Sequence, residues 1–258
     1  MDKSMNTKFS NILITGASSG IGEALAEHYA SVGAKNLFIC GRNAERLAQV
    51  AQKCSQKGIS VHTQILNVSD CNATQKWIEE CNRLAPLNLV VANAGVATLE
   101  ETTEHVYNTF NINVFGVLNT IHPALDIYKK RKDDSPKAIA ILSSIAGYHG
   151  LAACPSYSAS KACVKAYGEA LRAAYLKQNI QINVICPGFV KSRITDKNTC
   201  PMPFFMSAEK AADIIASRLE KNVGLIAFPW PMRLGTWFLS ILPNCISTFI
   251  YSKLPHKV

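Results

Sequence analysis

Two tyrosine–lysine pairs in the chain have a spacing that would place both side chains on one face of a helix. Tyr157 and Lys161 belong to "YSASK", and Tyr128 and Lys132 belong to "YKKRK". Residues i and i+4 are neighbours on a helix surface, so either pair would set an ammonium group beside a phenol. A cation about 4 Å from a phenolate stabilises it by up to about 4 kcal/mol at an effective dielectric of 20. Such a phenol, with an ordinary pKa near 10, becomes able to exchange protons near neutral pH.

The surrounding sequence distinguishes the two pairs. Tyr128 opens "YKKRKDDSP", a dense run of charge that is typical of a solvated helix end, so we expect Tyr128 at the surface. Tyr157 instead lies in a stretch of small residues that follows the strand-like run "AIAILSS", residues 138–144. Ser144 ends that run, 13 residues before Tyr157. We therefore expect Tyr157 and Lys161 at the edge of a sheet, close to Ser144.

Seven apolar runs alternate with stretches of helical periodicity. They are residues 11–15, 36–40, 59–66, 87–93, 138–144, 180–186 and 224–228. Continuous apolar strands that alternate with helices predict a parallel sheet covered on both faces, a doubly wound α/β architecture of the Rossmann type. With 258 residues and no repeat or flexible linker, the chain is expected to form a single domain over residues 1–258. Ligands of such sheets bind beyond the carboxyl ends of the strands.

Cysteine and histidine usage indicates neither a disulfide framework nor a metal site. The nine cysteines include no CxxC pair, and the six histidines show no ligand spacing. This pattern is typical of a reducing compartment, and the polar N-terminal residues lack a signal-peptide core, so we expect a cytoplasmic protein. Cys154 and Cys186, near the predicted site, are interpreted as packing residues because neither has a paired base.

The net charge of +9 indicates an anionic partner. The positive residues are dispersed apart from "KKRK", and aromatic side chains are not interleaved with them, which argues against nucleic acid. An anionic cofactor and an anionic membrane surface are the alternatives that stay open.

A glycine-rich turn follows the first predicted strand. "TGASSGIG", residues 15–22, leads from that strand into a segment with helical periodicity. Its glycines permit a tight turn and close approach of the backbone to a phosphate, and the helix N-terminus supplies free N–H groups. The expected phosphate contacts come from Gly16, Ser18, Ser19, Gly20, Ile21 and Gly22.

Arg42 favours NADP(H) over NAD(H). It stands at the end of the second predicted strand, 20 residues after Gly22, where a dinucleotide's adenosine ribose would lie. An acidic residue there would bind the ribose hydroxyls of NAD, whereas an arginine binds a 2′-phosphate in bidentate fashion. A solvated arginine at a helix start is the alternative interpretation.

The chain resembles the short-chain dehydrogenase/reductase family. The resemblance rests on "TGASSGIG", "ANAG" (92–95), "NVFG" (113–116), "SSIAG" (143–147), "YSASK" and "PGFVKS" (187–192), which occur in the family order over residues 10–228. It implies a catalytic set of Asn113, Ser144, Tyr157 and Lys161. Ser144 would bind the substrate oxygen, Tyr157 would exchange its proton, Lys161 would hold the nicotinamide ribose and Asn113 would anchor a water.

The resemblance also implies the remaining contacts to the dinucleotide. They would come from Arg42, Asn67, Val68, Asn93, Ala94, Gly95, Tyr157, Lys161, Pro187, Gly188, Val190 and Ser192. Asn67 departs from the family's usual aspartate, although its amide oxygen can still accept a proton from adenine. Ser192 replaces the commoner threonine and keeps its hydroxyl, and we interpret Ala92, in place of an asparagine, as structural. The expected activity is hydride transfer between NADP(H) and a carbonyl or alcohol group.

Two segments suggest a hydrophobic substrate and a further partner. Residues 189–206 are expected to form a flap over the substrate, with an apolar wall at 201–206. Residues 230–258 are apolar and basic, are interrupted at Gly235 and Pro243, and predict two broken amphipathic helices. These helices would pack on protein or bind a membrane surface as a peripheral contact. The family resemblance implies a homodimer or homotetramer formed through the helices that bear residues 103–130 and 156–178.

Two rival functions remain open. One is a nucleotide-binding regulatory protein that kept the fold without turnover, and the other is a lipid-binding module that works at a membrane surface. The first has no need for Tyr157 and Lys161 together, and the second leaves the motifs without a role.

Overall fold

Seven parallel strands form one sheet in the computed structural model, which describes residues 7–98, 100–197 and 201–252. The strand order is β3-β2-β1-β4-β5-β6-β7. The strands are β1 (Asn11–Thr15), β2 (Asn36–Gly41), β3 (Ser60–Ile65), β4 (Leu89–Ala92), β5 (Ala138–Leu142), β6 (Gln181–Pro187) and β7 (Leu225–Phe228). Each predicted apolar run contains or overlaps one of these strands, so the doubly wound parallel sheet is confirmed.

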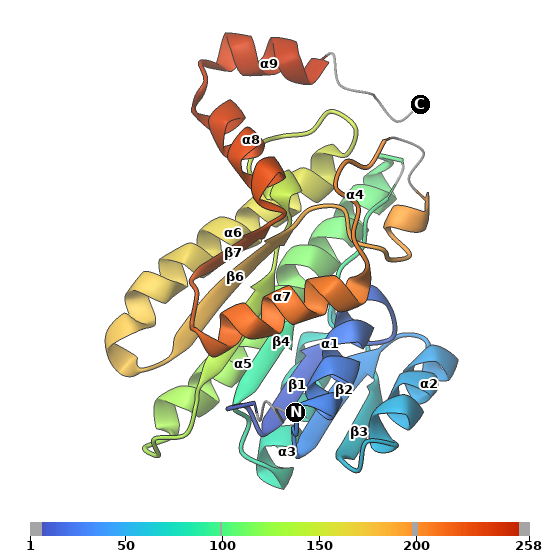
Figure 1. The fold of residues 1–258 in the computed structure, drawn as a ribbon, viewed down its shortest axis with the longest axis vertical. Helices are drawn as coiled ribbons and strands as arrows, with labels where there is room; N and C mark the ends of the chain where they lie inside the picture. The colour runs from blue at the N-terminus through green and yellow to red at the C-terminus, as the bar shows by residue number, and fades with distance from the viewer. Residues whose placement is uncertain (1–6, 99, 198–200, 253–258) are drawn as a thin grey trace, which may run out of the picture.

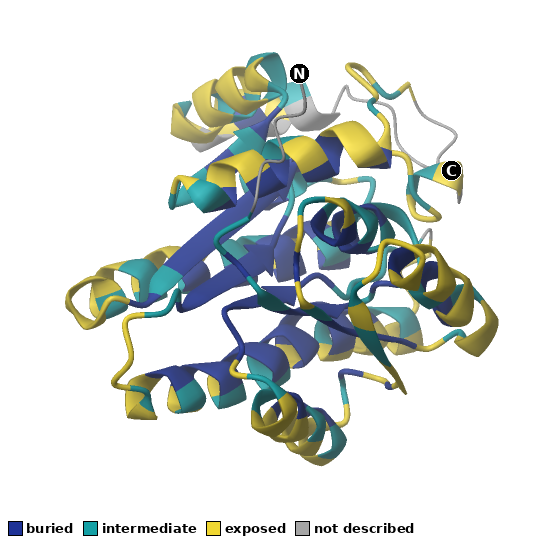
Figure 2. Cartoon of the chain, turned by 60° about the horizontal axis from the view of Figure 1, so that its bottom comes forward, coloured by how far each residue is buried: buried dark blue, intermediate teal, exposed yellow. Residues whose placement is uncertain are grey.

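Alternation of side chains along the strands divides the core in two. Ile12 and Ile14 of β1 belong to one buried cluster, whereas Leu13 belongs to the cluster on the opposite face. Successive residues of a strand point to opposite faces, so an uninterrupted apolar run fills both. Figure 2 shows most of the strands as the dark, buried centre, whereas the edge strand β3 is largely exposed, and the helices around the sheet expose their outer sides.

Helices cover both faces of the sheet. They are α1 (Gly20–Ser31), α2 (Ala44–Ser55), α3 (Cys71–Leu84), α4 (Thr103–Phe110), α5 (Gly116–Lys130), α6 (Pro155–Tyr175), α7 (Ala208–Glu220), α8 (Trp230–Ile241) and α9 (Asn244–Ser252). Residues of α1, α2 and α7 pack in one core cluster, and residues of α3, α5 and α6 pack in the other (Figure 1). The sheet is therefore the middle layer of three.

The strand order reverses between β1 and β4, which lie side by side and pair in register from Ile12 with Leu89 to Ile14 with Val91. Helices that follow these two strands leave in opposite directions across the sheet, so a crevice forms beyond their carboxyl ends. The glycine-rich turn follows β1, and residues 93–97 follow β4. The fold thus brings both segments to the place where a nucleotide is expected.

Tyr128 is buried in α5, and the prediction that it lies at the surface is wrong. Its side chain is 1% exposed, and its hydroxyl donates a hydrogen bond to the carbonyl oxygen of Ala138 at 3.3 Å. Tyr128 continues the buried stripe of α5 that includes Val117, Ile121 and Leu125, so its place on the helix outweighs the charge run that follows it. The helix ends at Lys130, and Lys132 is exposed beyond it.

The last two helices extend from the body of the molecule at its upper end in Figure 1. α8 directly follows β7, and α9 follows α8 after a short turn at Pro243. All the residues of α8 are at least partly exposed. Among the described residues, no helix has both the length and the apolar character needed to cross a bilayer.

Candidate active site

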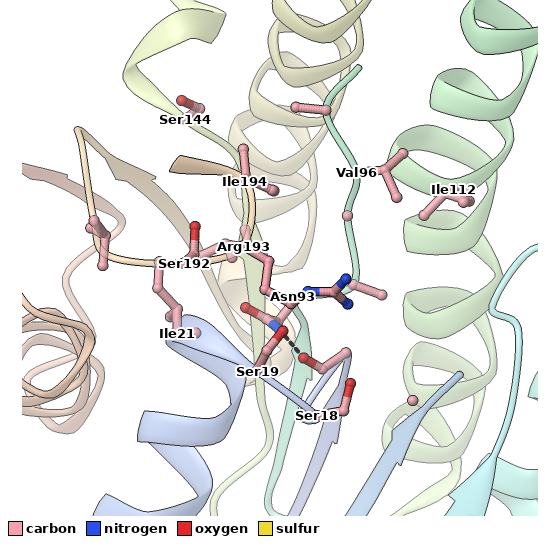
Figure 3. Close-up of a pocket in the computed structure, with 18 of the residues that line it drawn as sticks. Ser18, Ser19, Ile21, Asn93, Val96, Ile112, Ser144, Ser192, Arg193 and Ile194 are labelled. Atoms are coloured by element: carbon pink, nitrogen blue, oxygen red, sulfur yellow. Dashed lines mark hydrogen bonds between the residues drawn. The ribbon is translucent and has the colours of Figure 1, made fainter. Parts of the chain in front are cut away.

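A cavity of about 620 Å³ opens at the carboxyl edge of the sheet. It collects the glycine-rich turn, the ends of β2, β4 and β5, the start of α6 and the segment after β6. Figure 3 shows Ser18 and Ser19 at one end of this pocket and Ser144 at the other. Of the predicted site residues, all but Gly22 and Asn113 line it: Gly16, Ser18, Ser19, Gly20, Ile21, Arg42, Asn67, Val68, Asn93, Ala94, Gly95, Ser144, Tyr157, Lys161, Pro187, Gly188, Val190 and Ser192.

The glycine-rich turn has no room for a side chain at Gly16 or Gly22. Gly16 and Gly20 have φ angles of 67° and 61°, a left-handed region that favours glycine. A Cβ atom on Gly16 would lie 2.7 Å from Cα of Ala94. Gly22 lies beneath the turn rather than in the cavity wall, and a Cβ there would lie 2.4 Å from Nδ2 of Asn93. The backbone is thus held close to the opposite wall, with the N-terminus of α1 directed at the cavity.

Asn93 fastens this turn to the end of β4. Its Nδ2 donates to the carbonyl oxygens of Thr15 at 2.8 Å and Gly16 at 3.1 Å. The hydroxyl of Thr15 in turn accepts from the backbone N–H groups of Asn93 and Ala94. These bonds join the two strands on either side of the crevice, so Asn93 shapes the phosphate loop from behind.

Two arginines stand where a dinucleotide's adenosine ribose is expected. Arg42 follows β2 and is exposed, and Asn43 caps α2 by accepting a hydrogen bond from the backbone N–H of Arg46 at 2.9 Å. This cap directs the first turn of α2 toward the cavity, which Arg46 also lines. Nε of Arg46 is buried and lacks a hydrogen-bond partner within the described part of the chain. Sequence reasoning missed Arg46, although its place four residues after Arg42 was a usable signal.

The residues after β3 form another part of the cavity wall at the end where the adenosine is expected. Asn67 and Val68 line the cavity beside Leu66. Oδ1 of Asn67 accepts from the backbone N–H of Ser69 at 3.3 Å. Because an amide oxygen has two lone pairs, this bond leaves it able to accept a second donor.

The pair of Tyr157 and Lys161 lies at the opposite end of the cavity. Both side chains project from α6, and Nζ of Lys161 is 5.8 Å from the centroid of the Tyr157 ring. Nζ of Lys161 also donates to the carbonyl oxygen of Leu142 at 2.9 Å, which ties it to the end of β5. A hydrogen bond joins the side chains of Tyr157 and Ser144. The spacing of four thus places the two groups together, as the sequence predicted.

Ser144 is set by the turn that follows β5. Its Oγ accepts from the backbone N–H of Ala146 at 3.1 Å and donates to the carbonyl oxygen of Pro187 at 3.5 Å. This geometry caps the short helical turn Ile145–Gly147 and links β5 to the end of β6. The hydroxyl is therefore held in one place beside the phenol of Tyr157.

Asn113 lies behind the cavity wall. It belongs to a π-helical turn, Asn111–Phe115, and its side chain is fully buried. Its Oδ1 accepts from the backbone N–H of Val96 at 2.8 Å, and its Nδ2 donates to the carbonyl oxygen of Val96 and to Oγ of Ser160. These bonds connect the segment after β4 to α6. Asn113 is placed to hold the wall and α6 together.

Burial dominates the electrostatics of the tyrosine–lysine pair. It raises the pKa of Tyr157 to about 12, against the opposing effect of the Ser144 hydrogen bond. It also lowers the pKa of Lys161 to about 8, because the ammonium group loses its hydration. The expectation that Lys161 lowers the phenol's pKa below 10 is therefore wrong for the polypeptide by itself. The phenol is protonated at pH 7.

The buried thiol of Cys186 is a packing group. It lies in a small core cluster with Ile145 and Val184, and burial raises its pKa to about 11. The described residues contain no cluster of histidine, cysteine and acidic side chains that could hold a metal ion.

The segment after β6 contributes to the cavity differently from the prediction. Ser192, Arg193, Ile194 and Thr195 line the cavity, whereas residues 201–206, the expected apolar wall, do not. Val190 forms a bridge with Met206, which returns the segment to the end of β6. This return leaves the side chains of Phe204 and Phe205 57% and 47% exposed. Residues 198–200 lie outside the described part of the chain.

Comparison with known proteins identifies the family. The family model described as short chain dehydrogenase matches residues 10–201. The chain belongs to the short-chain dehydrogenase/reductase family. An uncharacterised oxidoreductase of Myxococcus xanthus is 34% identical, over 90% of this chain and 92% of that protein. A 3-dehydrosphinganine reductase of Arabidopsis thaliana is 36% identical, over 84% of this chain and 64% of that protein.

Solved structures of the family share the fold. A short-chain dehydrogenase/reductase of Burkholderia phymatum in complex with NAD has a TM-score of 0.81 at 22% identity, over 92% of this chain and 94% of that one. The L-sorbose reductase of Gluconobacter frateurii, complexed with NADPH and L-sorbose, has a TM-score of 0.75 at 23% identity, over 88% of this chain and 97% of that one. The chain is thus an oxidoreductase of this family with a Rossmann fold, and family membership supports a nicotinamide cofactor and a small-molecule substrate.

Proposed function

We propose that the protein reduces a hydrophobic ketone with NADPH, with Tyr157 as the proton donor. The observation that carries this proposal is the convergence of Ser144, Tyr157 and Lys161 in the same cavity as the glycine-rich turn. One end of that cavity suits a diphosphate and the other holds a phenol, so a dinucleotide spanning it would bring its nicotinamide to the phenol. A nucleotide-binding module has no use for the second half of this arrangement.

The residues divide the chemistry as follows. Ser144 donates a hydrogen bond to the substrate oxygen and holds it beside the hydroxyl of Tyr157. A nicotinamide held in this cavity would supply the hydride for the carbonyl carbon. As negative charge develops on the oxygen, Tyr157 transfers its proton there, and Lys161 stabilises the phenolate that results. Tyr157, whose pKa is raised to about 12 by burial, is protonated at neutral pH, as a proton donor in carbonyl reduction must be.

Arg42 and Arg46 support NADP(H) as the cofactor. A 2′-phosphate bound there would meet the exposed guanidinium of Arg42, and Arg46, which also lines the cavity, adds a second. Among the described residues, none of the side chains that line the cavity is acidic, so none binds ribose hydroxyls as an aspartate or glutamate would. The residues present therefore fit the phosphorylated cofactor.

Apolar side chains in the cavity wall support an apolar substrate. Ala97 and Ile194 line the cavity, as do Val96 and Ile112, which pack with Val68 near the nucleotide end. The Arabidopsis relative is by its name a reductase of 3-dehydrosphinganine. We therefore propose a ketone carried on an apolar chain as the substrate class, in preference to a polar sugar ketone.

The direct test measures oxidation of NADPH and NADH by the wild-type protein with 3-dehydrosphinganine and with L-sorbose. The proposal predicts turnover of the apolar ketone with NADPH, and its loss in Tyr157→Phe. NADPH binding without turnover of any ketone would favour a regulatory nucleotide-binding protein instead. Turnover of L-sorbose alone would overturn the assignment of an apolar substrate.

We also propose self-association through the helices that bear residues 103–130 and 156–178. Tyr107 on α4 is 67% exposed, and Phe115 in the following turn is also exposed, which supports an interface there. Light scattering coupled to size-exclusion chromatography tests this proposal, with Tyr107→Glu expected to shift the protein toward the monomer. A monomeric wild type would contradict it.

A further inference from the structure

α8 carries an apolar face that the described chain leaves uncovered. Trp230, Leu234, Trp237, Phe238 and Ile241 recur at the spacing of one helix face, and each is between 50% and 73% exposed. Met232 lies on another side of the helix and packs against the cluster around Cys186, next to Gly188. The helix is therefore anchored to the body through Met232 while its aromatic side faces away.

Exposed apolar residues of two other segments belong to the same edge of the molecule. Ile246 and Phe249 of α9 are 46% and 65% exposed, and Phe204 and Phe205 precede α7. The segment of Phe204 returns to the end of β6 through the bridge between Val190 and Met206, and α8 begins just beyond β7. Figure 1 shows α8, α9 and this segment at one end of the molecule. The end is the carboxyl edge of the sheet, where the cavity opens.

The charge of this edge favours an anionic partner. Glu220 is the last acidic residue of the chain, so neither α8 nor α9 contains one. Arg233 on α8 is exposed, as are Lys191 and Arg193 after β6. Acidic residues of this edge include Glu100, Glu101, Glu104 and Asp196, in the segments that follow β4 and β6, and Glu209 of α7, which interacts with Lys191. On α8, Arg233 thus occurs together with aromatic side chains and without any acidic residue.

We propose that α8 and α9 dock on the surface of an anionic lipid bilayer and that the carboxyl edge of the sheet faces it. Tryptophan and phenylalanine rings on one side of a helix, with basic residues beside them, are typical of helices that lie in the bilayer interface. A helix of 12 residues is about 18 Å long, shorter than the hydrocarbon core of about 30 Å, so α8 lies along the surface.

Charge favours an anionic lipid surface over a second copy of the chain as the partner of α8. A two-fold contact through the same face would gather Arg233 from both copies without an acidic partner on either helix. Anionic headgroups instead supply the opposite charge along the whole face. One consequence rests on the proposed function. An apolar ketone dissolved in the bilayer would meet the mouth of the cavity directly.

Vesicle flotation tests the docking without any assay of activity. Wild-type protein is mixed with vesicles of phosphatidylglycerol and phosphatidylcholine in equal parts, and the bound fraction is compared with that of Trp237→Ser/Phe238→Ser. Loss of two rings from the interface is expected to weaken partition about tenfold or more. Leu176→Ser is the matched control, because Leu176 is 69% exposed but precedes β6 at the opposite edge of the sheet. It is expected to bind vesicles as the wild type does.

Three outcomes would overturn the proposal. One is an unchanged bound fraction for the double variant, and another is equal binding of the wild type to vesicles of phosphatidylcholine alone. The third is a wild type that does not bind vesicles. If its dimer, followed by light scattering, also dissociates in the double variant, the face belongs to a contact with a second copy. Thermal unfolding and NADPH binding of the double variant check that the fold is intact, and failure of ketone turnover leaves the flotation result unaffected.

Discussion

Nζ of Lys161 lies 5.8 Å from the centroid of the Tyr157 ring and donates a hydrogen bond to the carbonyl oxygen of Leu142. The hydrogen bond to Leu142 holds the ammonium group in a fixed position beside the tyrosine ring. The ammonium group lies buried at the end of β5, and burial lowers its pKa to about 8 because the charge loses its hydration. The burial that strengthens the attraction between Lys161 and a phenolate therefore also lowers the stability of the folded protein.

Lys161→Met is predicted to stabilise the protein at neutral pH while it abolishes turnover. A lysine whose pKa falls from 10.5 to about 8 binds fewer protons folded than unfolded between those values, so the free energy of unfolding rises with pH there. Below pH 8 the penalty is complete, and after loss of the Leu142 hydrogen bond the variant should gain about 1–3 kcal/mol. Urea unfolding at pH 7 and pH 10 measures this gain, which should shrink toward the higher pH. A variant less stable than the wild type at pH 7 would contradict the buried charge.

Arg42→Ala is predicted to weaken NADPH binding by roughly ten- to a hundredfold, the loss expected for charged hydrogen bonds to one phosphate. NADH binding should change little, because NADH carries no 2′-phosphate. Fluorescence titration of both cofactors checks the difference, with Arg83→Ala on the exposed face of α3 as the control. Equal losses of affinity for NADPH and NADH would show that Arg42 does not bind the 2′-phosphate. Arg46→Ala is expected to act in the same direction.

Gly22→Ala is predicted to disrupt the phosphate turn. A Cβ atom there would lie 2.4 Å from Nδ2 of Asn93 and 2.5 Å from the carbonyl oxygen of Gly16, so the turn must shift. We expect a loss of about 1–3 kcal/mol in the free energy of unfolding, typical of overpacking, together with weaker NADPH binding. Gly150→Ala is the control, since its Cβ would meet nothing within 4 Å. Normal NADPH affinity in Gly22→Ala would show that the turn tolerates the movement.

Tyr128→Phe separates the two tyrosine–lysine pairs. Removal of its hydroxyl deletes the hydrogen bond to Ala138 and should cost about 1 kcal/mol of stability. Because Tyr128 lies in the core away from the cavity, kcat/KM should be unchanged. Chemical denaturation and steady-state kinetics together check this, and a large loss of kcat/KM without a loss of stability would contradict the assignment.

Much of the fold was predictable because buried parallel strands are uninterrupted apolar runs. All seven strands were predicted, although β3 is a largely exposed edge strand rather than a buried run. The meeting of the glycine-rich turn with Tyr157 and Lys161 followed from the rule that sites form at carboxyl ends. Tyr128 was misplaced because a charge run describes the end of a helix, whereas burial is decided by the face on which a residue lies. Position on the face could have been read from its spacing to Val117, Ile121 and Leu125.

Other parts of the site depend on long-range packing that a single sequence does not reveal. The amide of Asn113 turns toward Val96 rather than into the cavity because a π-helical turn rotates it. Phe204 and Phe205 face outward because residues 189–191 and Met206 are bonded together across the segment. The raised pKa of Tyr157 likewise follows from its tertiary surroundings, whereas spacing alone indicated only the neighbouring charge.

The central claim is that the phenol of Tyr157 delivers a proton to a substrate oxygen beside a bound nicotinamide. Its most direct test is a single-turnover measurement in which protein loaded with NADPH is mixed with a ketone substrate, and the wild type is compared with Tyr157→Phe. The account predicts that Tyr157→Phe binds NADPH normally but transfers hydride at least about a hundredfold more slowly, as expected for loss of a general acid. Equal single-turnover rates for the two proteins would contradict it.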